Sequence, residues 1–167
     1  MNERPKIKLE LTATDKGFEI LGWSSLVAFW VFTITHYKHL PDTIPIHWNG
    51  SGQADGFGGK GNILILPFVA TILSIGLTIL NKFPHHFNYP TKITEENAAR
   101  QYINATRLIR YTKVIIVFIF GMIALQTIKY VNGQTSGLGL WFFPLTLGLI
   151  FIPLTYFVIR SFRATTK

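Results

Sequence analysis

Apolar residues along this chain gather into four long blocks that are separated by polar stretches. The blocks cover about residues 17–37, 62–81, 111–130 and 137–159. A helix needs about 20 apolar residues, at about 1.5 Å each, to cross the roughly 30 Å hydrocarbon layer of a membrane. None of the blocks carries the continuous charged stripe that a surface helix of a soluble protein shows. The pattern therefore predicts an all-α integral membrane protein with four transmembrane helices.

The third block is the shortest, because its uncharged part lies between Lys113 and Lys129. We expect both lysines to extend along the lipid and place their ammonium groups at the interface, so that this block still spans the membrane. No ionisable residue falls near the middle of any block, where ion and proton pathways usually place one. Transport is therefore disfavoured.

Local signals refine the ends and the shape of these helices. Thr94, which is followed by two glutamates, predicts a helix N-terminus with acidic residues in its first turn. We expect this helix to run on into the third block. Pro144 and Pro153 lie inside the fourth block and should bend it at two places.

Basic residues are distributed unequally between the connecting segments. If Lys113 and Lys129 are counted with the segments that adjoin them, Lys and Arg occur four times before the first block, six times between the second and third, and three times after the fourth, but only three times in the other two loops together. The positive-inside rule therefore predicts that both termini are cytoplasmic. The predicted topology is a cytoplasmic tail 1–16, an outer loop 38–61, a cytoplasmic segment 82–110 and a cytoplasmic tail 160–167. The net charge of +8 then reflects topology, and no nucleic acid is expected as a partner.

Three arginines of the cytoplasmic segment, Arg100, Arg107 and Arg110, alternate with apolar residues. We interpret them as a solvated flank of the third helix. The alternative is that they bind the headgroups of anionic lipids.

The densest chemistry lies in the outer loop, between Leu40 and Gly61. Pro41 and Pro45 stiffen its first half, and six glycines in its second half allow tight turns. We expect the loop to fold compactly, with its polar side chains converging on the outer face of the first helical hairpin. The candidate ligand-binding or loop-structuring residues are Asp42, His47, Trp48, Asn49, Gly52, Asp55 and Lys60.

Two chemical interpretations of this loop stay open. His47 and Asp55 are candidate ligands for a divalent metal, or an acid–base pair, although their spacing matches no zinc motif. Alternatively, the carboxylates and Asn49 accept hydrogen bonds from the backbone of turns, while His47 and Trp48 pack the loop onto the helices. The chain has no cysteine, which excludes disulfides and thiolate sites. The sequence requires no cofactor.

The loop also resembles a known family. The run Leu40-Pro41-Asp42-x-Ile44-Pro45-x-His47-Trp48-Asn49-x-x-Gly52-x-x-Asp55, with Lys60 and Pro67 after it, is similar to the signature of the bacterial membrane family called domain of unknown function 1648. This domain also forms the N-terminal part of SdpI-type immunity proteins. Trp48 stands where the family usually shows phenylalanine. The chain also departs from full SdpI proteins in lacking their extra C-terminal helices.

The residues and the resemblance together predict a multi-pass protein of a bacterial cytoplasmic membrane, with the lipid bilayer as its first partner. Our main hypothesis is a non-enzymatic binding, immunity or signalling module whose loop recognises an extracytoplasmic peptide or another membrane protein. One alternative is a metal-dependent or enzymatic membrane factor that uses His47 and Asp55. Another is a passive assembly subunit whose loop is covered by a different chain.

Overall fold

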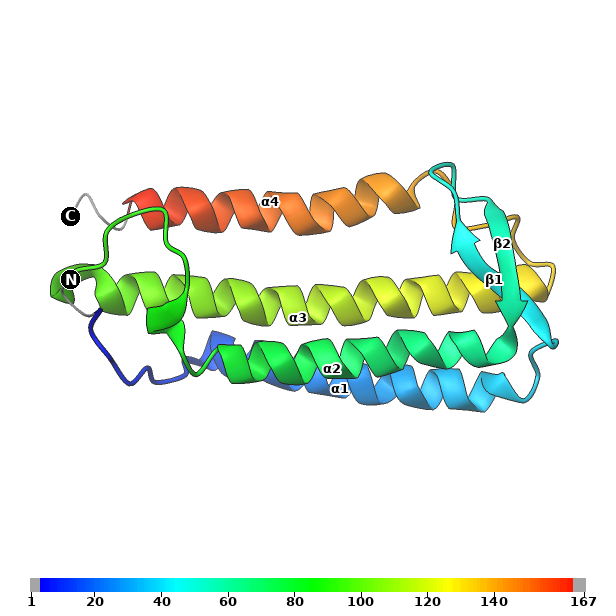
Figure 1. Ribbon diagram of the computed structural model, residues 1–167, viewed down its shortest axis with the longest axis horizontal. Helices are drawn as coiled ribbons and strands as arrows, with labels where there is room; N and C mark the ends of the chain where they lie inside the picture. Colours follow the sequence, from blue (N-terminus) through cyan, green and yellow to red (C-terminus); the bar gives the residue numbers. More distant parts are fainter. Residues whose placement is uncertain (1–3, 164–167) are drawn as a thin grey trace.

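The computed structural model describes residues 4–163, and four long helices dominate it (Figure 1). These are α1 (Ala13–Tyr37), α2 (Ile65–Leu80), α3 (Glu95–Val131) and α4 (Phe142–Arg163). Strands β1 (Thr43–Trp48) and β2 (Ala54–Gly59) form a hairpin at one end of the molecule, here called the hairpin end. The opposite end, here called the basic end, holds residues 82–94 and the start of α3. Short 3-10 helices η1 (Lys60–Leu64) and η2 (Pro84–His86) complete the fold.

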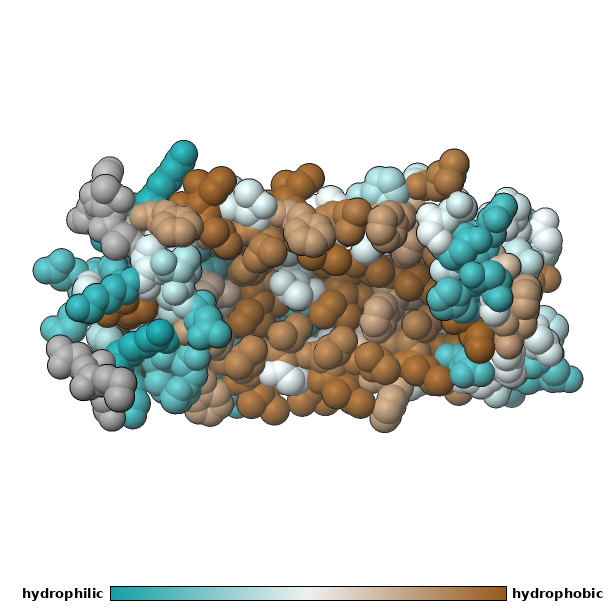
Figure 2. Space-filling model, turned by 45° about the horizontal axis from the view of Figure 1, so that its top comes forward, coloured by the Kyte–Doolittle hydropathy of each residue, from teal (hydrophilic) through white to brown (hydrophobic). Residues whose placement is uncertain are grey.

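Apolar side chains form a broad band around the middle of the molecule. On the face shown in Figure 2, this band lies between two polar ends. Many of its large apolar side chains are exposed on the protein surface; Ile20 (70% exposed) and Ile152 (72%) are examples. Such a surface is unfavourable in water and favourable in lipid. All four helices are long and apolar enough to cross a membrane, which confirms a mostly helical, multi-pass membrane protein.

The four helices do not pack equally. Helix α3 packs against each of the other three, whereas α4 packs mainly against α3. The buried apolar core accordingly comes from α1, α2, α3, β1, η1 and the turn after α1: Leu26, Phe29, Leu40, Ile44, Ile63, Ala70, Val117, Ala124 and Ile128. Only 6% of the apolar window of α4 is buried within the protein. Helix α4 is therefore a peripheral helix that contacts the rest of the protein mainly through α3.

The predicted start of α3 is confirmed. The Thr94 hydroxyl accepts a hydrogen bond from the backbone N–H of Asn97 at 3.4 Å. The Asn97 side-chain oxygen accepts one in return from the Thr94 N–H at 3.0 Å, which closes a capping box. As predicted, the same helix runs on into the third apolar block without interruption.

Helix α4 begins later than its apolar block suggested. Residues 137–141 form a loop before Phe142, and Gly139 in this loop has φ +82°, a left-handed conformation that glycine tolerates best. Pro144 consequently lies in the first turn of α4, where a missing N–H leaves no hydrogen bond unmade. The prediction of two bends was therefore wrong for Pro144, and Pro153 is the proline inside the helix. Residues 1–3 and 164–167 of the two predicted tails lie outside the described residues.

Charged residues join α1 to α3 near the basic end. Arg107 Nε lies 2.9 Å from Asp15 Oδ1, and Arg110 Nε lies 3.1 Å from Glu19 Oε1. The Lys113 ammonium also binds Glu19. The expectation of a solvated arginine flank was therefore wrong for Arg107 and Arg110, since acidic side chains of α1 draw both inward.

Lys113 differs most from its predicted place. Its side chain is 2% exposed, and besides Glu19 the ammonium donates to Thr78 Oγ1 at 3.2 Å and lies 5.0 Å from the ring centre of Trp23. The expected position along the lipid was wrong, because a carboxylate, a hydroxyl and an aromatic face solvate the ammonium inside the bundle.

Candidate functional site

The loop between α1 and α2 folds as an antiparallel β-hairpin. Thr43 pairs with Gly59 and Trp48 pairs with Ala54, while Ile46 has no partner because the register is irregular there. Asn49 organises the turn: its side-chain oxygen accepts hydrogen bonds from the backbone N–H groups of Ser51 and Gln53, each at 3.0 Å. This is the backbone-shaping role that short polar side chains take in turns.

The charged candidates form two separate pairs. His47 Nδ1 lies 2.5 Å from Asp55 Oδ1 near the turn. Lys60 Nζ lies 3.0 Å from Asp42 Oδ1 at the other end of the hairpin. Antiparallel pairing explains the difference from the expected convergence, because each strand residue rises roughly 3.3 Å and so carries positions 42 and 47 apart. Each charge instead meets one beside its own end of the hairpin: the register partner of His47 is Gly56, the neighbour of Asp55.

The His47–Asp55 pair is well exposed, with 71% and 43% of the two side chains accessible. The carboxylate orients the imidazole through Nδ1, which leaves Nε2 as its second hydrogen-bonding group. Within residues 4–163, no group of three or more His, Asp or Glu side chains is placed to hold a metal ion. Zinc sites use at least three protein ligands, so this donor set by itself does not fit one.

A pocket of about 500 Å³ lies beneath the hairpin. Its walls come from β1, from the start of α2 with η1, from α3 and from the start of α4. The lining residues are Ile44, Pro45, Ile46, His47, Trp48, Asn62, Ile63, Ile65, Leu66, Ile123, Thr127, Leu138 and Phe142. The walls are mainly apolar, and His47, Asn62 and Thr127 add polar groups. A pocket of this size and character is typical of ligand sites in proteins.

Strand β1 contributes its free edge to this pocket. Five consecutive residues of β1, from Ile44 to Trp48, line it. Successive side chains of a strand point to opposite faces, so a pocket that touches all five runs along the edge of the strand. The other edge of β1 is paired with β2.

The turn of the hairpin rests on the loop between α3 and α4. The Gly52 carbonyl accepts a hydrogen bond from the Leu138 N–H at 2.8 Å. Gly52 has φ +74°, and a Cβ there would lie 2.8 Å from the backbone nitrogen of Gly139. Trp48 adds an edge-to-face contact with Tyr130 of α3, with ring centres 5.5 Å apart. These contacts hold the roof of the pocket over its walls.

Sequence reasoning found the hairpin residues but not the walls beneath them. Ile123, Thr127, Leu138 and Phe142 were not predicted as site residues, because each lies in or beside an apolar span where nothing distinguishes a pocket wall from a lipid-facing residue. The one available signal was the glycine pair at 137 and 139. Two glycines beside a helix start indicate a close backbone approach.

Comparison with known proteins finds a family match for the segment that contains the hairpin. Residues 25–71 match the family described as Domain of unknown function (DUF1648). This confirms the resemblance that the loop motif indicated. The matched segment, here called the DUF1648 segment, contains all seven candidate loop residues, whereas the walls from α3 and α4 lie outside it.

A curated relative extends the comparison. An uncharacterized protein from Archaeoglobus fulgidus is 31% identical over 100 residues, which covers 52% of this chain and 55% of the relative. This chain therefore spans about half the length of the curated relative that it matches. No solved structure matches the chain significantly.

Proposed function

We propose that this protein is a non-enzymatic membrane receptor that binds an extended extracytoplasmic peptide in the pocket beneath the hairpin. The free edge of β1 carries this proposal. A strand edge presents unpaired backbone N–H and C=O groups, and added peptide strands use such groups for affinity. Pockets beside the edge then select side chains.

The composition of the pocket supports the same ligand. Its apolar walls suit the apolar side chains of a peptide, while His47 and Asn62 lie where a peptide backbone or a polar side chain would pass. The hairpin is anchored to α3 and α4 by Trp48 and Gly52. Binding at the edge of β1 would therefore act on α4, which is the most weakly packed helix. Immunity to a peptide, or signalling in response to one, are the roles that such binding would serve.

The orientation of the chain is part of this proposal. We infer that the hairpin end faces outward and the basic end faces the cytoplasm of a bacterial cell, because basic residues gather at one end. A reporter fused after Thr135 should then read as extracytoplasmic, and one fused after Lys92 as cytoplasmic. Paired alkaline phosphatase and fluorescent protein fusions measure this. A cytoplasmic reading at Thr135 would reverse the orientation and remove the peptide proposal with it.

Photocrosslinking in intact cells tests the ligand. A benzophenone amino acid replaces Ile46, which lines the pocket on β1 and is 50% exposed. The matched control replaces Phe57, which is 53% exposed on β2 and does not line the pocket. Mass spectrometry of the digested adducts identifies what was attached. We expect a peptide adduct at position 46 that is several times more abundant than at position 57.

Other outcomes identify the alternatives. Adducts at position 46 that contain only phospholipid would show that the pocket belongs to the bilayer. Adducts to an intact membrane protein would support the passive assembly subunit. Equal adducts at positions 46 and 57 would show that the edge of β1 has no selective role.

A further inference from the structure

Three arginines line a second pocket at the basic end. Arg100 and Arg107 of α3 and Arg160 of α4 surround a volume of about 210 Å³, together with Ile103 and Asn104. Arg100 and Arg107 are two helical turns apart and so share one face of α3. No acidic residue lines this pocket.

The positive charge of this pocket is only partly balanced. Arg107 binds Asp15 through Nε at 2.9 Å and through Nη2 at 3.4 Å. The third guanidinium nitrogen, Nη1, does not bind Asp15 and can donate to a ligand. Among residues 4–163, neither Arg100 nor Arg160 takes part in an ion pair. Arginines that converge repel one another, and an anion between them removes this cost.

Asn104 gives an independent indication of a ligand. It is 8% exposed and lines the same pocket. Its amide nitrogen donates to the Phe157 carbonyl at 2.8 Å, which fixes the side chain. Its oxygen is buried without a hydrogen-bond partner, and buried polar atoms usually have one. Because Asn104 lines the pocket, a small shift of its side chain would let a ligand that carries a hydroxyl beside its negative charge bind both the arginines and this oxygen.

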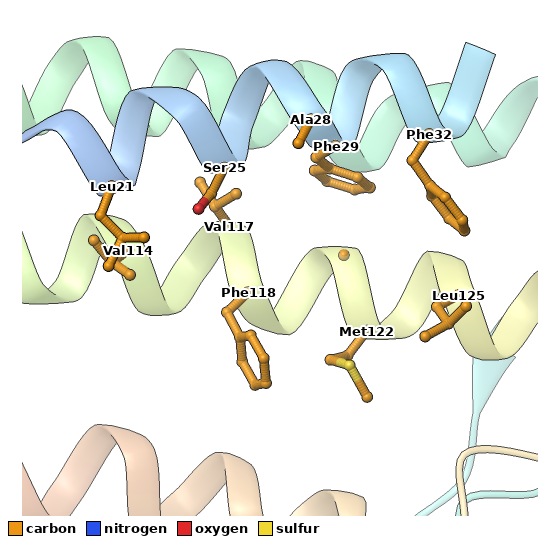
Figure 3. Close-up of a pocket in the computed structure, with 11 residues that line it drawn as sticks. Leu21, Ser25, Ala28, Phe29, Phe32, Val114, Val117, Phe118, Met122 and Leu125 are labelled. Carbon is orange, nitrogen blue, oxygen red and sulfur yellow. The ribbon is translucent and has the colours of Figure 1, made fainter. Parts of the chain in front are cut away.

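An apolar groove lies farther along α3, toward the middle of the molecule. It has a volume of about 480 Å³ and lies between α1 and α3 (Figure 3). Its lining from α3 includes Val114, Phe118 and Leu125, which lie on the helix face that also carries Arg107. In Figure 3 the ring of Phe118 points away from α1, toward α4. Positions 107, 114, 118 and 125 recur at helical spacing. The first of them lies about 10 Å before the second, at 1.5 Å per residue.

We propose that this side of the protein binds an anionic phospholipid with a hydroxylated headgroup. The phosphate lies between Arg100, Arg107 and Arg160, and an acyl chain lies in the groove between α1 and α3. Arginine forms paired hydrogen bonds with phosphate oxygens.

Native mass spectrometry of the full-length protein in detergent tests this proposal. The probes are phosphatidylglycerol and phosphatidylcholine with identical acyl chains, and inorganic phosphate. The protein with both Arg100→Gln and Arg160→Gln is compared with Arg163→Gln, which removes one charge from α4 outside the pocket. Arg107 is kept because it holds Asp15.

We expect phosphatidylglycerol to bind the unmodified protein and Arg163→Gln more tightly than phosphatidylcholine does. The double variant should bind phosphatidylglycerol at least about tenfold more weakly, as expected when charge-assisted hydrogen bonds are lost. Equal binding of the two lipids, or full retention by the double variant, would overturn the proposal.

A second variant separates the lipid from free phosphate. Gly121 lines the groove, and a Cβ there meets no atom within 4 Å, so Gly121→Leu adds apolar bulk to the groove from an unobstructed position. It should weaken phosphatidylglycerol binding and leave the arginines intact. If Gly121→Leu changes nothing and inorganic phosphate competes fully with the lipid, the site binds a free anion and the lipid assignment fails.

Discussion

Glu19→Gln should lower the free energy of unfolding by about 3–5 kcal/mol, the usual cost of removing one partner from a buried ion pair. Glu19 is the counter-charge of both Arg110 and Lys113. Their side chains are 8% and 2% exposed, so neither cation can recover its lost partner from water. Reversible unfolding in mixed micelles measures the change.

A matched control and a rescue variant make this result specific. Asp42→Asn removes the Asp42–Lys60 pair, in which the Asp42 side chain is 96% exposed, and it should cost less than about 1 kcal/mol. Combining Glu19→Gln with Lys113→Met removes one of the two stranded cations and should recover part of the loss. Equal effects of Glu19→Gln and Asp42→Asn would contradict the role of this cluster in holding α1 to α3.

Gly52→Ala should detach the hairpin from the loop between α3 and α4. An L-residue in the left-handed region costs roughly 1–2 kcal/mol. The new Cβ would also lie 2.8 Å from the Gly139 nitrogen and 2.9 Å from its oxygen. Because both are backbone atoms, the turn itself must move. We therefore expect a total cost above about 2 kcal/mol at this contact.

Amide exchange of Leu138 reports this change directly, because its N–H donates to the Gly52 carbonyl. Exchange at Leu138 should accelerate, while exchange in the middle of α3 stays slow. Gly50→Ala is the control, since a Cβ at Gly50 meets no atom within 4 Å and its φ is not in the left-handed region. If Leu138 exchanges at the same rate in both variants, Gly52 does not hold the roof of the pocket.

The features that the sequence by itself determined are those that depend on neighbours along the chain. Four helices of membrane-spanning length follow from apolar blocks of about 20 residues. Thr94 marks the start of α3 because a cap acts within three residues of its own position. The family resemblance also rests on a local motif, between Leu40 and Asp55.

Only the tertiary structure decided which way each side chain faces. A span that is apolar on all sides carries little periodic signal, so its rotation depends on packing. Rotation of α1 and α3 brings Glu19 to Lys113 and turns an expected lipid-facing lysine into a buried one. Antiparallel pairing likewise brings His47 to Asp55, and the docking of the hairpin on α3 and α4 creates the pocket. These contacts join residues that are distant along the chain. The free energy of packing them together therefore cannot be predicted from the sequence pattern around any one of them.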